Sequence, residues 1–199
     1  CGLSTKSANL PECSLARSCY FYFFWYDKPM KSDSVFLRAL EPSDIEILFQ
    51  LENNSLYWKY SNRTEPFSKA LLENYIAQQS QDIFEVKQKR FVLASSSKET
   101  LGFVDLFDFE PLHRRAGVGL LIKEEKQGNG FGKIALNLLA TYAQKHLNIH
   151  CLYANIALEN KPSIRVFEAC GFRQVGLKKA WNFYKDQFHD EYLYQKLFH

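Results

Sequence analysis

The chain has 199 residues, enough for one domain with a full hydrophobic core and too few for two comfortable ones. Apolar residues make up 46% of the sequence and charged residues 24%, a balance that excludes a disordered chain. The formal net charge is only +3, from 25 basic and 22 acidic residues, so the charge gives no indication of nucleic-acid binding.

The sequence also disfavours a membrane span and a disulfide framework. The longest unbroken apolar run, from Cys19 to Tyr26, is far shorter than the roughly 20 residues that a membrane-spanning helix needs. The five cysteines are an odd number and include no Cys-x-x-Cys pair, which indicates neither disulfides nor a zinc ribbon. We therefore expect a cytoplasmic protein.

The first 29 residues differ in composition from the rest of the chain. They hold three of the five cysteines and seven consecutive aromatic residues, and they end just before Met30, the only methionine. We expect residues 1–29 to be a non-native or upstream-translated leader and residues 30–199 to be the domain. A genuine appendage is one alternative. A secretory signal is another, although Asp27 and Lys28 stand where a signal would carry a small-residue cleavage site.

In chain order, the first predicted elements of the domain are a strand over residues 35–40 and a helix that opens at Pro42 and ends at Asn53. A second helix begins near Ser68, which is a favourable N-cap residue. Its apolar face is predicted to hold Leu71, Leu72, Tyr75 and Ile76.

Two further helices and six strands complete the predicted domain. The helices cover residues 130–145 and 162–170, and Gly171 ends the second one in a left-handed conformation. The strands cover residues 91–95, 101–109, 115–122, 151–158, 173–178 and 191–197. Hairpins in the middle of the chain and a β-helix-β-helix-β-β order at its end predict a single mixed α/β (α+β) domain.

The segment from Gln127 to Lys133, with the sequence Gln-Gly-Asn-Gly-Phe-Gly-Lys, is the most informative motif. It lies between an apolar strand and an amphipathic helix, and its three glycines occupy alternate positions. Without Cβ atoms, the backbone N–H groups can approach a bulky anion at the helix N-terminus, where the helix dipole favours negative charge. The motif therefore predicts a site for a diphosphate.

Two other phosphate-binding motifs fit this loop less well. A Walker A loop needs four residues between its first glycine and its Gly-Lys pair and then Ser or Thr, whereas three residues separate Gly128 from Gly132, and Ile134 follows the lysine. A dinucleotide fingerprint would follow its strand directly, but residues 123–127 intervene. A glycine-rich turn that only starts the helix is the plain alternative.

The loop resembles the coenzyme A loop of the GNAT superfamily of N-acetyltransferases, and the resemblance covers most of residues 30–199. The segments that follow the family's order are 37–41, 101–106, 113–116, 160–163 and 170–172. The chain looks most like the bacterial branch of spermidine N-acetyltransferases and ribosomal-protein N-terminal acetyltransferases. The resemblance implies a splayed β-sheet flanked by helices, acetyl-CoA as cofactor, and direct transfer of the acetyl group to a primary amine in a ternary complex.

The resemblance also implies where coenzyme A binds: on the strand before the loop, on the loop itself and on the last helix. The residues implied are Leu121, Ile122, Gln127, Gly128, Asn129, Gly130, Phe131, Gly132, Lys133, Asn160, Ser163 and Phe167. No metal is expected. His146 and His150 lie one helical turn apart beside Cys151, but no further ligand accompanies them.

The acceptor amine must lose a proton, because a free amine of the lysine class has a pKa near ~10.4. Asp105, Asp108 and Glu110 lie on one predicted strand, and the spermidine branch resembles this chain in carrying acidic residues there. Asp105 and Asp108 cannot share a face of a regular strand, whereas Asp108 and Glu110 can. We favour Asp108 as the base, directly or through water. The alternative is that these carboxylates are solvated hairpin ends.

The resemblance breaks at the general acid. Many family members carry a Tyr seven residues after the Asn that opens the last helix, but this position is Phe167, which has no proton to give. Ser163 is the candidate substitute, although its hydroxyl also suits a helix cap, and Tyr184 is a third candidate. Alternatively the thiolate leaves unassisted, since a thiol pKa near ~8.5 makes it a good leaving group.

The acceptor entrance is expected between the first two helices and the C-terminal hairpin. The residues expected there are Asn53, Tyr57, Trp58, Tyr60, Glu65, Asp105, Trp181 and Tyr184. This largely aromatic set suits an amine cation but would also suit a core or an interface. A polyamine such as spermidine and a protein N-terminus are both implied as acceptors, without a nucleic-acid or membrane partner. A homo-oligomer is left open.

A second function stays open at this stage. Phe167 is compatible with a coenzyme A-binding sensor or interaction domain of the same fold that has lost turnover.

Overall fold

The computed structural model describes residues 35–58, 60 and 65–199, so the leader expected at residues 1–29 lies outside the described part of the chain. The strands are β1 (Val35–Ala39), β2 (Lys89–Ser95), β3 (Thr100–Glu110), β4 (Arg115–Ile122), β5 (Cys151–Ala157), β6 (Arg173–Tyr184) and β7 (Gln187–Leu197). The helices are α1 (Ile45–Glu52), α2 (Ser55–Trp58), α3 (Lys69–Gln78), α4 (Ile83–Val86), α5 (Phe131–Leu147) and α6 (Lys161–Ala169). Two 3-10 turns are η1 (Pro42–Asp44) and η2 (Glu124–Lys126).

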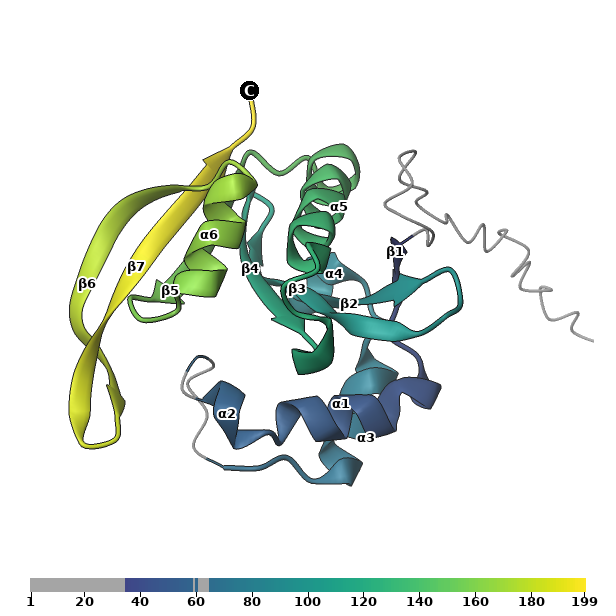
Figure 1. Cartoon of the computed structure of the whole chain (residues 1–199). Coiled ribbons are helices and arrows are strands. Elements are labelled where there is room, and N and C mark those ends of the chain that lie inside the picture. The colour runs from purple at the N-terminus through teal and green to yellow at the C-terminus, as the bar shows by residue number, and fades with distance from the viewer. Residues whose placement is uncertain (1–34, 59, 61–64) are drawn as a thin grey trace, which may run out of the picture.

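A seven-stranded sheet organises the domain (Figure 1), in the order β1-β2-β3-β4-β5-β7-β6. Every neighbouring pair in it is antiparallel except β4 and β5, which are parallel and are joined through α5. β2, β3 and β4 follow one another as hairpins, whereas β7 returns between β5 and β6. This arrangement confirms the predicted mixed α/β class.

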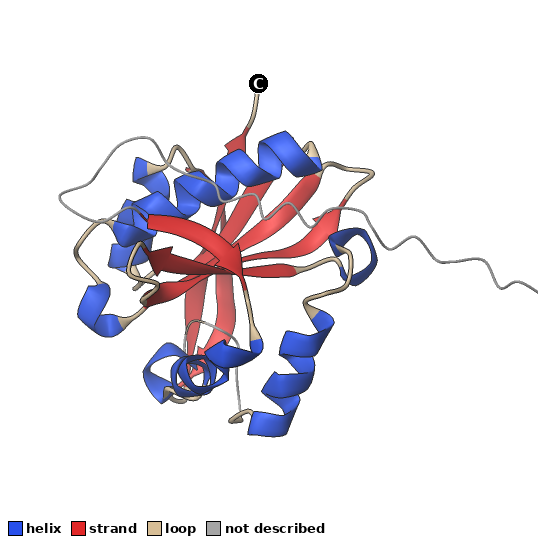
Figure 2. Ribbon diagram, turned by 90° about the vertical axis from the view of Figure 1, so that its right-hand side faces the viewer, coloured by secondary structure: helices blue, strands red, loops and turns tan. Residues whose placement is uncertain are grey.

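Helices cover both faces of the sheet (Figure 2). α5 and α6 lie over the larger core, in which Leu139 of α5 and Val104 of β3 are fully buried. α1 and α3 lie over a smaller core around Phe103, in which Leu48 is fully buried. Because successive residues of a strand point to opposite faces, the neighbours Phe103 and Val104 belong to different cores.

The prediction for α3 is partly confirmed. Ser68 caps the helix, since its hydroxyl accepts a hydrogen bond from the Leu71 amide at 3.2 Å. The predicted burial of Leu71 is wrong, because its side chain is 49% exposed. Leu72 and Ile76, one helical turn apart, form the buried stripe, and Leu71 projects about 100° away from Leu72 around the helix axis.

The C-terminal hairpin is longer than predicted. β6 continues to Tyr184 and β7 starts at Gln187, and the two residues between them have φ of 49° and 58°, as a type I′ turn requires. Phe183 and Phe188, which are 63% and 66% exposed, pack on each other near the turn with ring centroids 5.0 Å apart. The alternation that marks a half-buried strand is therefore missing in this part of the sequence. The single-turn helices α2 and α4 are too short to give a periodic signal.

Candidate active site

The parallel strands β4 and β5 separate after only three paired positions. Arg115–Gly117 pairs with Cys151–Tyr153, and beyond these residues the two strands continue without pairing to each other (Figure 1). On its β5 side, no described strand therefore pairs with the half of β4 from Val118 to Ile122. The backbone N–H and C=O groups of that edge can bind an extended polar chain.

The glycine loop follows β4 after the short turn η2. Gly128 and Gly130 have φ of 77° and 81°, in the left-handed region, and Gly130 caps the 17-residue helix α5 without any side-chain cap. The first N–H groups of α5 are left for an external acceptor. A Cβ on Gly128 would meet nothing within 4 Å, so the loop presents open backbone. The residues present therefore fit a diphosphate.

Two side chains implied to bind coenzyme A hold the loop in shape. The Gln127 side-chain amide donates to the Ile122 carbonyl at 3.0 Å, and the Asn129 amide donates to the carbonyls of Lys126 and Gln127 at 3.3 and 3.1 Å. Both residues thus fix the backbone that would contact the cofactor. Phe131 is half-buried against the larger core, and Lys133 is exposed on the first turn of α5.

The start of α6 lies close to the start of α5. A Cβ on Gly132 would lie 3.3 Å from side-chain atoms of Leu120 and Val166, so only a small residue lets α5 approach β4 and α6 this closely. Asn160 caps α6 by accepting from the Ser163 amide at 3.2 Å. The interpretation of the Ser163 hydroxyl as the helix cap is therefore wrong, because the cap is the Asn160 side chain.

Phe167, at the position of the missing tyrosine, is part of the larger core. Its side chain is 3% exposed and packs edge-on against Phe172, with ring centroids 5.0 Å apart. Cys170 follows it, is also buried, and donates weakly to the Lys133 carbonyl, with its Sγ 3.7 Å from the oxygen. Cys170 is thus a small packing residue of the larger core.

Asp108 lies near the point where β4 and β5 part. It occupies a bulge of β3 between Phe107 and Glu110 with a left-handed φ of 47°, and Tyr153 donates its hydroxyl proton to the Asp108 carboxylate at 3.0 Å. Burial, and then this carboxylate, raise the pKa of Tyr153 to about 12, so the hydroxyl keeps its proton. The bulge breaks the regular alternation on which the predicted face of Asp108 and Glu110 depended.

Glycine is required beside this pair. A Cβ on Gly117 would lie 2.2 Å from the Phe107 ring, which crosses β4 there and meets the Tyr153 ring edge-on at 6.0 Å. Gly117 thus lets Phe107 and Tyr153 pack over the strand that separates them.

Asp105 lies three residues before Asp108 and has different partners. Its two carboxylate oxygens accept from Arg90 Nε and Nη2 at 2.6 and 2.8 Å, and Arg90 also pairs with Glu52 of α1. Burial alone would lower the pKa of Arg90, but Asp105 and Glu52 raise it well above its usual value. This ion-pair cluster links α1 to the sheet, so both Asp105 oxygens are engaged within the fold.

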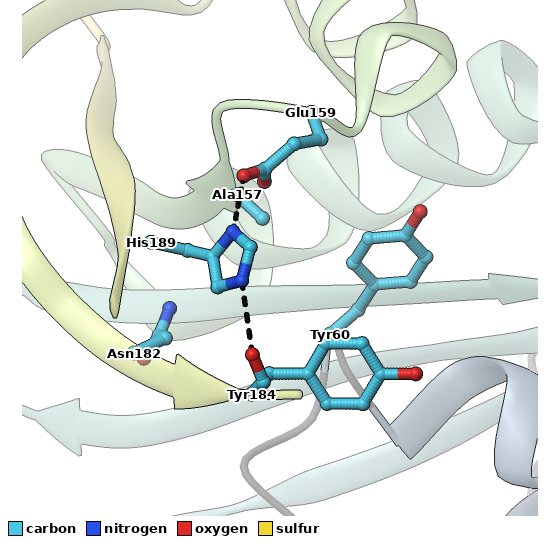
Figure 3. A pocket seen from close by; sticks show the side chains of 6 residues that line it. All are labelled: Tyr60, Ala157, Glu159, Asn182, Tyr184 and His189. Carbon is cyan, nitrogen blue, oxygen red and sulfur yellow. Dashed lines mark hydrogen bonds and ion pairs between the residues drawn. The ribbon is translucent and has the colours of Figure 1, made fainter. Parts of the chain in front are cut away.

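A cavity lies beside the end of β5 (Figure 3). Its lining residues are Tyr60, Ala157, Glu159, Asn182, Tyr184 and His189. His189 lies between two acceptors: its Nδ1 is 2.7 Å from Glu159 Oε1 and its Nε2 is 3.1 Å from the Tyr184 carbonyl oxygen. The structure thus brings together two of the expected acceptor residues, Tyr60 and Tyr184, with a carboxylate.

Buried charge supports one side of this cavity. Glu191, which is 7% exposed, accepts from Lys178 at 2.9 Å and from Asn182 at 3.0 Å, and Lys178 also donates to Asn155 at 2.8 Å. Asn182 therefore reaches the cavity from a position fixed by a buried carboxylate.

The remaining expected acceptor residues do not line this cavity. Asn53 holds the backbone of Phe67 through two hydrogen bonds, at 2.7 and 3.0 Å. The Trp58 indole donates a hydrogen bond to the Glu52 carbonyl at 3.0 Å. The pKa of Tyr57 is raised, mainly by burial and further by the negative charges of Glu124 and Glu125. Glu65 is exposed after the undescribed residues 61–64, and the 58% exposed Trp181 lies under the Lys178 ammonium, 4.8 Å away.

The sequence reasoning misses Tyr153, Glu159 and His189. Tyr153 and Ala157 lie on one face of β5, so strand alternation could have connected Tyr153 to the site. Glu159 directly precedes the motif residue Asn160. His189 lies in the stretch of β7 that the sequence does not predict as strand, so nothing in the sequence placed it opposite Glu159. Elsewhere, His146 stacks on Tyr142. In the described residues no three His, Cys, Asp or Glu side chains group as metal ligands.

The mixed sheet opens beside β4, and the glycine-rich start of α5 near this opening has no side-chain cap. This arrangement defines the class of protein: an acyltransferase that uses a coenzyme A thioester. Comparison with known proteins agrees. The acetyltransferase (GNAT) domain family matches residues 34–173. The chain belongs to this family: it is an N-acetyltransferase, and acetyl-CoA is its acetyl donor.

Two curated relatives and one solved structure illustrate the similarity. Spermidine N(1)-acetyltransferase of Vibrio cholerae is 33% identical over 143 residues, which cover 70% of this chain and 79% of the relative. The Escherichia coli K12 enzyme of the same name is 32% identical over 148 residues, or 72% and 75%. The crystal structure of the Vibrio cholerae spermidine N-acetyltransferase with CoA and spermine superposes with a TM-score of 0.76 at 29% identity, covering 82% of this chain and 95% of that one. In the described residues, no helix has the length and apolar character needed to cross a membrane.

Proposed function

We propose that this chain acetylates a primary amine of a polyamine such as spermidine, in a ternary complex with acetyl-CoA. The observation that carries this choice of acceptor is the cavity in which the Glu159 carboxylate lies with Tyr60 and Tyr184. A carboxylate and aromatic rings together suit an organic cation. The two relatives named as spermidine N-acetyltransferases support the same class of acceptor.

Acetyl-CoA, when bound, supplies an activated acetyl carbon and a thiolate leaving group. The free edge of β4 at Leu121 and Ile122 would hold the pantetheine arm, and the amides from Gly128 to Gly132 would hold the diphosphate. N–H groups on the same β4 edge would stabilise the negative charge that develops on the acetyl oxygen.

Asp108 is the base in this proposal. Its carboxylate would take the proton of the attacking amine, directly or through water. The hydrogen bond from Tyr153 holds one carboxylate oxygen in place, so the second oxygen is left to face the amine. Tyr153 thus acts here as a positioning residue.

The general acid stays a prediction. Ser163 is our candidate, because its hydroxyl lies in the first turn of α6 and Asn160 holds its amide. Phe167 cannot serve, so the reaction would otherwise depend on unassisted departure of the thiolate.

Thiol release from acetyl-CoA with a panel of acceptors tests the proposal. The panel is spermidine, a simple diamine, an aminoglycoside and a ribosomal-protein N-terminal peptide, each at the same concentration. We expect kcat/KM for spermidine to exceed that for a peptide chosen without lysine by about 10²-fold, because such a peptide lacks a second ammonium group for the carboxylate cavity. A higher kcat/KM with the peptide would contradict the polyamine assignment and favour protein N-terminal acetylation.

A further inference from the structure

The side-chain amide of Asn182 has a fixed direction. Asn182 lines the cavity from β6 (Figure 3), and its Nδ2 donates a hydrogen bond to Glu191 Oε1 at 3.0 Å. An ionised carboxylate only accepts hydrogen bonds, so the NH₂ end of the amide must face Glu191 and the carbonyl end must point away from it. A flipped amide would place two acceptors against each other.

Glu191 can impose this direction because it is buried and is itself held in place. Its other oxygen, Oε2, accepts from the Lys178 ammonium at 2.9 Å, and Lys178 also donates to Asn155 Oδ1 at 2.8 Å. The hydrogen bonds thus connect β5, β6 and β7 beneath the cavity. A buried carboxylate that loses a hydrogen-bond partner costs stability, so rotation of the Asn182 amide away from Glu191 is unfavourable.

The carbonyl end of Asn182 is an unused acceptor in the cavity wall. Within residues 35–58, 60 and 65–199, no group donates a hydrogen bond to Asn182 Oδ1. The side chain is half-buried, so a molecule in the cavity can reach this oxygen. A carbonyl oxygen binds a protonated nitrogen through a charge-assisted hydrogen bond, which is stronger than a bond between neutral groups.

We propose that Asn182 is a specificity-determining residue, whose Oδ1 accepts a hydrogen bond from a protonated nitrogen of the polyamine. Glu191 is the positioning residue that directs the carbonyl to this task. The inference rests on the proposed function and deepens it, because it requires an N–H on the second nitrogen of the substrate and not only a positive charge.

The nitrogen that meets Asn182 is not the one that reacts. The attacking nitrogen must lose its proton to expose a lone pair, whereas the nitrogen at Oδ1 keeps its proton. The cavity residue Ala157 and the Asp108 partner Tyr153 lie on the same face of β5, four residues and hence about 13 Å apart along the strand. A flexible aliphatic chain can therefore present one nitrogen to Asp108 and another to Asn182.

Two acceptors that differ by one N–H test the proposal. Both are octamethylenediamine with one primary amine left to react, and the far nitrogen is dimethylated in the first and trimethylated in the second. Both far nitrogens are charged at about pH 8, since an alkylamine has a pKa near ~10.4, but only the dimethylated one has an N–H. We expect kcat/KM of the wild type to be about tenfold higher for the dimethylated acceptor. The difference should lie in KM, because the far nitrogen does not react.

Variants separate the hydrogen bond from the shape of the cavity. Asn182→Leu replaces the amide by an apolar side chain of similar shape and should bring the ratio of the two kcat/KM values to about one. Glu191→Gln should lower the ratio by a smaller factor, since a glutamine amide can donate as well as accept and lets the Asn182 amide flip. Gln174→Leu removes an exposed amide from the start of the same strand and is the matched control, with the ratio of the wild type.

Equal kcat/KM for the two acceptors in the wild type, or a wild-type ratio in Asn182→Leu, would overturn the proposal. An unchanged ratio in Glu191→Gln would overturn the role of Glu191. Should a variant fail to fold, the ratio in the wild type still decides. Thiol release with spermidine is measured alongside. Its absence would contradict the proposed function itself, whereas release together with equal use of the two acceptors contradicts only the role of Asn182.

Discussion

At the scale of single residues, Asp108 has an unusual backbone conformation. A non-glycine residue with φ of 47° is uncommon, and aspartate is among the few side chains that adopt this region without a large cost. The resulting bulge turns the carboxylate out of the regular alternation of β3 and into hydrogen-bond distance of Tyr153. Such bulges occur preferentially next to active sites, where they redirect a side chain.

We expect Asp108→Asn to lower kcat/KM for spermidine by about 10² to 10³-fold, because an amide cannot accept the amine proton. The acid limb of the kcat/KM profile against pH should disappear as well. Tyr153→Phe keeps the Asp108 carboxylate but removes the hydrogen bond that orients it, so about a tenfold loss of kcat is expected. Asp186→Asn, in the exposed β6–β7 turn, serves as the control. An unchanged pH profile in Asp108→Asn would show that Asp108 is not the base.

Gly130→Ala tests the loop at single-residue resolution. Alanine at φ of 81° is strained by about 1 to 2 kcal/mol, and relief of that strain would rotate the amides at the start of α5. We expect the Kd for CoA, measured by calorimetry, to rise at least about tenfold, because a 1.4 kcal/mol loss is tenfold in affinity. Gly176→Ala on β6 is the matched control, since its Cβ would make an ordinary 3.7 Å contact with Leu193. Equal CoA affinity in both variants would contradict the loop assignment.

At the scale of helices and strands, the Arg38–Asp44 ion pair connects β1 to the start of α1. Arg38 donates to the two Asp44 oxygens at 2.6 and 2.7 Å, and the Glu41 amide donates to Asp44 at 2.9 Å. Burial tends to raise the pKa of Asp44, but these hydrogen bonds outweigh it and hold the pKa below its ordinary value. A carboxylate of this kind stabilises the fold above its unfolded pKa, near ~3.9, and the contribution is lost as the pH falls through the folded pKa.

Asp44→Asn should therefore destabilise the protein by about 2 kcal/mol at neutral pH, because it leaves the half-buried Arg38 without its charged partner. The difference from the wild type should shrink below about pH 4, where the wild-type carboxylate also becomes protonated. Urea unfolding at the two pH values measures both effects. Glu73→Gln, exposed on α3, should change little. A difference that stays constant with pH would show that the charge of Asp44 does not stabilise this corner.

At the scale of the whole molecule, the opening of the sheet leaves polar backbone of β4 without a ladder partner among the described strands. The N–H groups at the start of α5 lack a side-chain cap at the same end of the opening. Unpaired polar backbone costs stability unless water or a ligand satisfies it. The fold is therefore expected to gain stability when coenzyme A supplies the missing partners.

CoA at about 100 times its Kd should stabilise the folded protein by about 2.7 kcal/mol and raise the Tm by about 5 to 10 °C. Thermal unfolding followed by circular dichroism measures the shift. Pantetheine, which can pair with β4 but has no diphosphate for the loop, should give a smaller shift at the same concentration. An equal shift with both compounds would contradict the role of the loop as the diphosphate site.

Much of the fold could be predicted from local patterns. The Ser68 cap and the glycines Gly130 and Gly171 depend on short-range chemistry, and the structure has all three where the sequence indicated a helix end. The cap of α6 is Asn160, not the Ser163 hydroxyl that the sequence suggested. The prediction was wrong where exposure hid the pattern, as in the outer half of the β6–β7 hairpin. It was also wrong for Leu71, because Leu72 and Ile76 form the buried stripe of α3 and the Leu71 side chain points away from it.

The sequence by itself determined the class of the fold and the loop that suits a diphosphate, because both depend on residues within one turn or strand of each other. Only the tertiary structure decided the pairs that carry the chemistry. Asp108 meets Tyr153 across 45 residues of sequence and Glu159 meets His189 across 30. Such contacts depend on a bulge, a strand register and a hairpin length, and each of these is set by how the whole sheet packs rather than by the residues themselves.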